Sequence, residues 1–147
     1  MRVSERAQAL VFVAVVLASI AGLWVAVKST VPDCGPGPAV RATLQLTGTS
    51  LSAGPVARTT SGCTVYDLLS GWANDTGTTL LVREAGEPLG AVFVLQIGGD
   101  ANGAGGRYWQ FWVNCAYATA GADLLRLHEG DHVHWRFVPE GWEGSPC

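Results

Sequence analysis

Positively charged residues are scarce in the larger part of this sequence. After Lys28 there are six arginines and no further lysine, set against eleven acidic residues, so that part carries a net charge of −5. A surface of this sign does not attract a phosphate backbone. The sequence therefore argues against nucleic acid as a partner.

Catalytic motifs are also missing. The sequence has no nucleophile elbow, no H-E-x-x-H and no P-loop. The glycine-rich stretch 98–106 lacks the lysine and the strand-to-helix context of a phosphate loop. We therefore predict that the protein is not an enzyme and holds no cofactor of its own.

None of the four cysteines belongs to a C-x-x-C pair, which removes the usual spacing of redox and zinc-ribbon motifs. The four are Cys34, Cys63, Cys115 and Cys147. Their even number favours two disulfides if this part of the chain is exported, with three connectivities open.

Residues 9–27 lack charge altogether, and Ser19 is their one polar interruption. A helix of this length spans roughly 28 Å, close to a bilayer core of about 30 Å. Arg2 and Arg6 precede it, so the positive-inside rule places the N-terminus in the cytoplasm. We predict a single-pass anchor in the lipid bilayer over residues 1–28, with the rest extracytoplasmic. A signal peptide cleaved after Ala21 is the alternative, although the apolar run continues beyond it.

The remainder divides into a Pro/Gly-rich stalk, 29–38, and a domain, 39–147. Alternating or aromatic runs predict strands, and the turn-rich stretch 48–60 has room for a further one. Residues 98–106, with five glycines, are typical of a mobile hairpin tip. The predicted strands are 39–47, 78–83, 92–97, 108–114 and 132–138.

One helix is predicted after Thr64, which forms a capping box with Asp67. Val65, Leu68, Leu69 and Trp72 then share one helical face, and the helix ends near Asn74-Asp75. Asn74-Asp75-Thr76 also matches a glycosylation triplet. Strands, one helix and further strands in this order predict an α+β fold of the β-grasp type, a mixed sheet around one packed helix.

Several of these segments together resemble the transcobalamin-like C-terminal domain family. The resemblance covers residues 39–138 and is carried by TVYDLL at 64–69, YWQFWVN at 108–114, Gly121-Ala122 and GDxVxW at 130–135. It implies a β-grasp related to soluble-ligand-binding domains. In the vitamin carriers this domain covers one side of a corrin, and the YWQ-type strand lies near the ligand. The present chain lacks their large helical domain.

The same resemblance carries a prediction of disulfide pairing. In a β-grasp the start of the first strand lies near the end of the second, which brings Cys34 close to Cys63. Cys115, which stands where the family usually has glycine, then takes Cys147.

The strand 108–114 supplies the candidate binding residues. Alternation places Tyr108, Gln110, Trp112 and Asn114 on one face, while Trp109, Phe111 and Val113 point into the core. We expect Tyr108, Gln110 and Trp112 to be an exposed stacking platform, with Gly103 and Gly105 of the adjacent tip able to adapt to a ligand. The alternative is that Tyr108 and Trp112 pack under a loop.

The last predicted strand offers a metal site instead. His132 and His134 share a face, and His128 lies just before them. Alternation directs the other side chains of this strand, Val133, Trp135 and Phe137, into the core. Two such histidines with a nearby acid can bind zinc or copper. Arg136 on the same face would repel a cation, so this remains the alternative.

These observations predict a membrane-anchored, extracytoplasmic binding or interaction module. In one version it helps to bind a planar, corrinoid-like small ligand. In the other it is an accessory subunit that docks onto a membrane protein complex.

Overall fold

The computed structural model describes residues 13–17, 19, 34, 39–60, 62–84, 91–142 and 144. The chain divides into two compact units, Met1–Val31 and Pro32–Cys147. In the first, residues 13–17 and 19 are helical. No helix within the described ranges is long and apolar enough to span a membrane. The predicted anchor, residues 9–27, lies largely outside those ranges.

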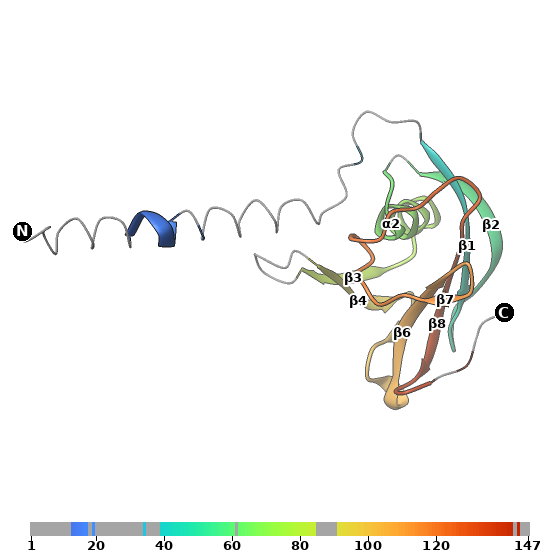
Figure 1. The fold of residues 1–147 in the computed structure, drawn as a ribbon. Coiled ribbons are helices and arrows are strands. Elements are labelled where there is room, and N and C mark those ends of the chain that lie inside the picture. The colour runs from blue at the N-terminus through green and yellow to red at the C-terminus, as the bar shows by residue number, and fades with distance from the viewer. Residues whose placement is uncertain are drawn as a thin grey trace, which may run out of the picture. The chain divides into compact units, whose positions relative to one another are not determined.

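The strands of the second unit form two sheets (Figure 1). Strand β1 lies parallel to β8, and the other neighbouring pairs are antiparallel. The predicted single mixed sheet is thus wrong in one respect, because the middle strands separate into a sheet of their own. The larger sheet has the order β2-β1-β8-β6-β7, with bounds Ser52–Thr60, Val40–Thr47, His132–Pro139, Arg107–Val113 and Ala116–Tyr117; the smaller joins β3, β4 and β5, at Leu80–Glu84, Val92–Ile97 and Asp100–Ala101.

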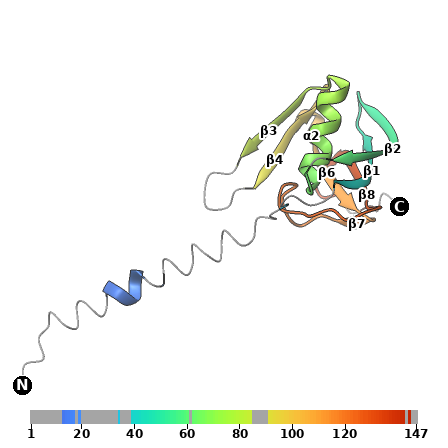
Figure 2. The same ribbon diagram turned by 90° about the horizontal axis from the view of Figure 1, so that it is seen from above.

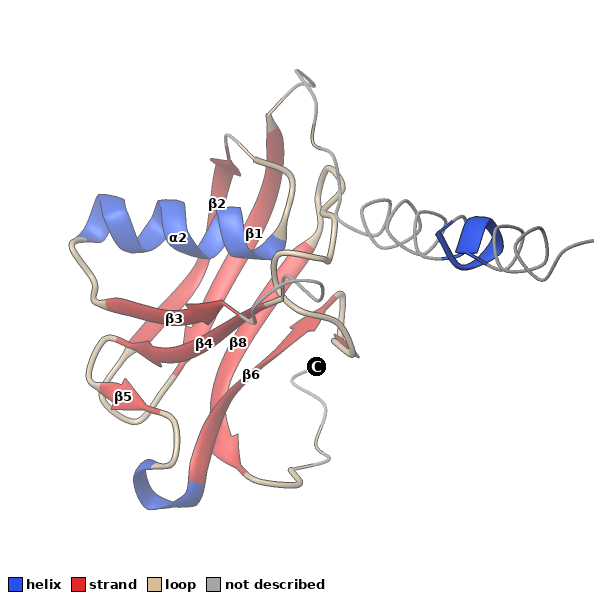
Figure 3. Ribbon diagram, turned by 90° about the vertical axis from the view of Figure 1, so that its left-hand side faces the viewer, coloured by secondary structure: helices blue, strands red, loops and turns tan. Residues whose placement is uncertain are grey.

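Helix α2, Val65–Thr76, and the small sheet lie on the same side of the large sheet (Figures 1 and 2). Figure 3 shows α2 crossing the strands of the large sheet. The core fills the space between these layers, and it includes the predicted helical face and the predicted inward residues of β6 and β8. Its members are Leu44, Leu46, Val65, Leu68, Leu69, Trp72, Ile97, Trp109, Phe111, Val133, Trp135 and Phe137, among others.

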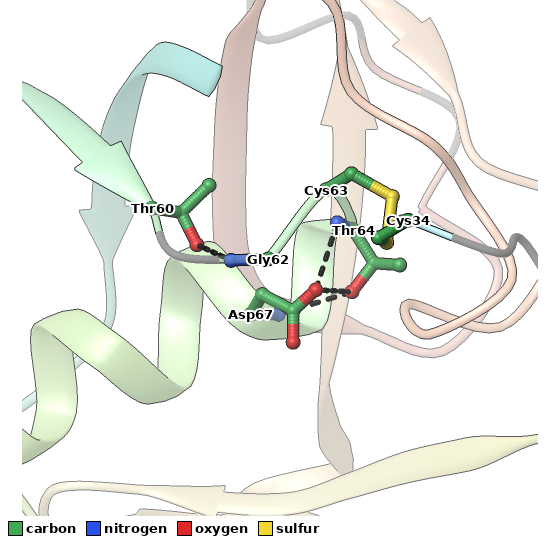
Figure 4. Close-up of a disulfide and its surroundings, with 6 residues drawn as sticks. All are labelled: Cys34, Thr60, Gly62, Cys63, Thr64 and Asp67. Atoms are coloured by element: carbon green, nitrogen blue, oxygen red, sulfur yellow. Dashed lines mark hydrogen bonds between the residues drawn. A yellow bond between two sulfur atoms is a disulfide. The ribbon is translucent and has the colours of Figure 1, made fainter. Parts of the chain in front are cut away.

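The start of α2 is fixed by the predicted capping box (Figure 4). The Thr64 hydroxyl accepts a hydrogen bond from the Asp67 N–H at 3.1 Å, and the Asp67 carboxylate accepts one from the Thr64 N–H at 3.0 Å. At the other end Gly77 adopts φ 66°, a left-handed conformation that favours glycine. The helix therefore runs slightly beyond the predicted end at Asn74-Asp75.

The stretch 98–106 contains more structure than the predicted hairpin tip. It holds β5, paired with β4, and a 3-10 turn at Ala104–Gly106. Asp100 is 5% exposed, and its carboxylate accepts hydrogen bonds from the N–H groups of Thr49 and Ser50. These contacts tie the stretch to the turn between β1 and β2.

The predicted disulfide between Cys34 and Cys63 is confirmed, with Cα atoms 5.5 Å apart (Figure 4). It joins the segment before β1 to the start of α2. Cys115 also takes part in a disulfide. Its predicted partner, Cys147, lies outside the described residues.

Candidate functional site

The candidate site lies on the outer face, which we define as the side of the large sheet turned away from α2. Side chains alternate along a strand, so the neighbours of core residues point to this side. In contrast to the apolar inner side, the outer face is mainly polar. It carries Thr43, Gln45 and Thr47 from β1, Gln110 and Trp112 from β6, Tyr117 from β7, and His132, His134 and Arg136 from β8.

Strand pairing brings the two predicted sites together on this face. In the antiparallel register of β6 and β8, Trp112 stands opposite His134 and Gln110 opposite Arg136. Directly opposite side chains in such a pair lie about 4.5–5.5 Å apart at Cβ. The aromatic strand and the histidine strand, considered as alternatives from the sequence, are therefore one continuous surface.

Trp112 is buried, at 3% exposure, so the prediction of an exposed Trp112 is wrong. Its ring meets Tyr117 edge-on, with centroids 5.5 Å apart, and Trp142 at 5.3 Å with an interplanar angle of 89°. Such edge-to-face pairs are favourable for aromatic rings. The Trp112 ring is thus covered by two residues that follow it in the chain, much as the loop-packing alternative expected.

Beside these rings is an open hollow of about 400 Å³. This volume falls within the range of about 300–1,000 Å³ that is usual for small-molecule sites. Two of the predicted binding residues, Gln110 and Trp112, line it. The other described lining residues are Tyr117, Gly141, Trp142 and Gly144.

The remaining predicted binding residues lie elsewhere. Tyr108 is 37% exposed on the outer face but does not line the hollow. Asn114 forms the β6–β7 turn with φ 49°, donates to Asp131 and accepts from the N–H of His132. Gly105 belongs to the 3-10 turn and Gly103 directly precedes it, and neither lines the hollow.

Sequence reasoning missed Tyr117 and Trp142. Tyr117 is the second residue of a two-residue strand, which is too short for an alternation pattern. Trp142 lies among glycines and acids, after the last predicted strand. A large apolar side chain in such a segment is itself a signal, because it gains free energy by packing back onto the domain.

Arg136 does not itself line the hollow, but it contacts Trp142, which does. Its guanidinium carbon is 4.5 Å from the centroid of the Trp142 ring, a cation–π contact. Its Nε atom is buried and has no hydrogen-bond partner among the described residues. The five strands of this sheet contain no acidic residue at all.

His134 is 7% exposed and shares a hydrogen bond of 2.9 Å, through Nε2, with the Thr47 hydroxyl. Burial, the charge of Arg136 and the neighbouring His132 together lower the pKa of His134 to about 4. The imidazole is therefore neutral at pH 7. The His132 and His134 rings are 6.2 Å apart at their centroids.

The three metal candidates do not converge. The exposed His128 ring pairs with Asp131 at 3.6 Å, away from the His134–Thr47 contact. Across the part of the chain that the structure describes, no three His, Cys, Asp or Glu side chains are grouped to hold a metal ion. A neutral His134 could ligate a metal, but Nε2 is engaged with Thr47.

The fold is similar to the crystal structure of a "putative metal binding protein" from Ruminococcus gnavus. The TM-score is 0.53 at 13% identity, and the match covers 70% of this chain and 99% of that chain. At this identity the likeness concerns the fold alone. No protein with a curated description matches the sequence significantly.

A family model described as "Domain of unknown function (DUF4430)" matches residues 64–138. The matched stretch runs from the cap of α2 nearly to the end of β8 and includes Gln110, Trp112, Tyr117 and Arg136. Trp142 lies beyond it. Because the match covers half of the chain, the protein belongs to the DUF4430 family.

Proposed function

We propose that this protein is a non-catalytic binding module for a small, flat ligand, and that the ligand lies in the hollow on the outer face. The observation that carries the proposal is the combination of a 400 Å³ hollow with three aromatic rings and one amide in its lining, from Gln110, Trp112, Tyr117 and Trp142. Apolar walls with a few polar groups are the usual composition of a ligand pocket.

The lining favours a flat ligand for a geometric reason. Tyr117 and Trp142 meet the buried Trp112 ring edge-on and cover it, so their own rings form the accessible aromatic walls of the hollow. An inserted planar group gains stacking and edge contacts from these walls. Gly141 and Gly144 add no side chain that would obstruct it. A corrinoid-like ring is one ligand of this class, and the resemblance to the transcobalamin-like family supports it.

The setting of the module is part of the proposal. The charge-free segment 9–27, preceded by Arg2 and Arg6, supports an anchor that holds the domain on the extracytoplasmic side. The disulfide between Cys34 and Cys63 agrees with this, because such bonds persist in oxidising compartments.

Naphthalene-2-carboxamide, a neutral and flat probe, tests the proposal by calorimetric titration of the full-length chain. We expect saturable binding that weakens at least fivefold in Tyr117→Ala, which removes a wall of the hollow. Phe93→Ala is the matched control, since Phe93 is an aromatic residue of similar exposure, 49% against 55% for Tyr117, on the other sheet. Absent binding, or equal loss in both variants, would contradict the proposal.

Metal binding is the second candidate. It is favoured by the similar crystal structure from Ruminococcus gnavus, which is named as that of a metal binding protein. His132 and His134 would be the ligands, as neutral imidazoles on one strand. Titration with Zn²⁺ and Cu²⁺ separates the candidates. If a metal binds tightly to the wild type and to Tyr117→Ala but not to His132→Ala or His134→Ala, the metal function takes precedence over the hollow.

A further inference from the structure

The large sheet carries an unusual charge pattern for this domain. The part of the chain after Lys28 has a net charge of −5, yet the five strands of the sheet hold four arginines and no acid. Two of these arginines, Arg58 and Arg107, are directed away from the outer face by the alternation of their strands. Arg41 and Arg136 are directed toward it. The strands therefore present two arginines and no acid on the outer face, within an acidic domain.

We propose that the ligand of the hollow is an anion, a carboxylate borne on a flat ring system, and that Arg136 and Gln110 recognise its carboxylate group. The proposal rests on the function proposed above and adds the charge of the ligand. Its first support is that Arg136 has no counter-ion among the described residues, in contrast to Arg58, which pairs with Asp75.

Arg136 is only partly open to solvent, which makes the missing counter-ion informative. Its Nε atom is buried and unpartnered within the described residues, and Trp142 covers one face of its guanidinium. Charged groups withdrawn from water are normally paired or hydrogen-bonded, because desolvation is costly. The Trp142 ring compensates for part of that cost through its cation–π contact. The N–H groups at the edge of the Arg136 guanidinium can therefore donate to a ligand carboxylate.

Gln110 is placed to donate a hydrogen bond to the same carboxylate. It stands directly opposite Arg136 in the register of β6 and β8 and also lines the hollow. An amide N–H₂ group beside a guanidinium offers two kinds of donor to the same oxyanion. A ring held against Tyr117 and Trp142 would lie next to Gln110, and Arg136 is the cross-strand neighbour of Gln110.

The neighbouring His134 is a neutral imidazole whose pKa responds to the charge of Arg136. His134 is buried and bonded to Thr47, and the charge of Arg136 contributes to its lowered pKa. An anion bound beside Arg136 would offset that charge, so the pKa of His134 should rise on binding. A neutral ligand of the same shape would not produce this rise.

One arginine selects a carboxylate over a phosphate. A carboxylate carries one charge and matches the planar guanidinium fork with two parallel hydrogen bonds. A phosphate monoester carries about −1.5 to −2 at neutral pH and calls for more than one cation. Arg41, the other outward arginine, lies at the opposite end of β1 from Thr47, the residue that pairs with Arg136.

Naphthalene-2-carboxylate and naphthalene-2-carboxamide form a matched pair of probes, identical in shape and different in charge. We expect the full-length wild-type chain to bind the carboxylate at least tenfold more tightly at low salt. In Arg136→Gln the two probes should bind with equal affinity. Arg41→Gln removes the same charge from the same face away from the hollow and should keep the tenfold preference.

The outcomes distinguish the proposed negative charge of the ligand from the proposed ligand-binding function. If neither probe binds, the ligand-binding function fails. If both bind equally to the wild type, the function stands and the anion inference is overturned, as it is if Arg41→Gln abolishes the preference as fully as Arg136→Gln. If Arg136→Gln does not fold, the wild-type comparison still decides, together with NMR titration of His134. The carboxylate should raise its pKa and the carboxamide should leave it unchanged.

Discussion

The two faces of the large sheet are covered by other parts of the chain to different extents. On the inner face, Leu44, Val133 and Trp135 are at most 2% exposed and pack beneath α2. The outer face is covered only locally, where Tyr117 and Trp142 shield Trp112. The inner face thus carries most of the apolar burial that stabilises the fold. The outer face combines polar side chains with a partly open aromatic cluster, a composition suited to binding.

The comparison makes a first prediction about the inner face. Trp135 is 2% exposed and stacks on Phe111, with centroids 4.5 Å apart. Trp135→Ala should lower the free energy of unfolding by about 3–5 kcal/mol, through lost burial and a cavity. Urea unfolding followed by circular dichroism measures this. A loss below about 1 kcal/mol would mean that the inner face is not the main source of stability.

The second prediction concerns pH and the outer face. Burial lowers the pKa of His134 to about 4 in the folded protein, whereas an unfolded histidine titrates near 6.5. As the pH falls below 6.5 the unfolded chain takes up the proton first, so the folded state loses stability. By pH 4 the loss reaches about 3 kcal/mol from this group.

His134→Gln removes the titration while keeping a group that can bond Thr47. The stability advantage of the wild type over this variant at pH 7 should therefore shrink as the pH approaches 4. Unfolding free energies of both proteins at pH 7, 5.5 and 4.5 test this. Parallel pH profiles would show that His134 is not the group responsible.

The smallest effect on the free energy of unfolding is expected when Trp142 is replaced. It lies on the rim of the outer face and contacts Arg136 and Trp112, so Trp142→Ala should lower the free energy of unfolding by about 1 kcal/mol. The same variant should weaken binding of naphthalene-2-carboxamide at least fivefold. An effect on stability as large as that of Trp135→Ala would erase the distinction between the two faces.

The two faces also differ in how far the sequence predicted them. Alternation correctly placed Trp109, Phe111, Val133, Trp135 and Phe137 inside, and a local capping motif fixed the start of α2. Each of these predictions depends on residues a few positions apart. The periodicity of a strand records which side is apolar, and that is sufficient for a core.

The outer face depends on contacts that periodicity does not record. Trp112 follows the strand pattern of an outward residue, but Trp142, thirty positions later, covers it. The meeting of the aromatic and histidine strands likewise required the register of β6 and β8. The separation of β3, β4 and β5 into a second sheet has the same origin, since pairing partners are long-range choices.

The tryptophans provide the most direct test of whether the outer face binds the ligand, because they lie on both faces of the large sheet. Trp72, Trp109 and Trp135 belong to the core, whereas Trp112 and Trp142 stand beside the hollow. Titration of the full-length chain with naphthalene-2-carboxylate, followed through the indole N–H resonances by NMR, should shift the signals of Trp112 and Trp142 and leave those of the three core tryptophans in place. Shifts centred on Trp109 or Trp135, or no shift at Trp112 and Trp142 under saturating probe, would contradict the claim that the outer face is the binding surface.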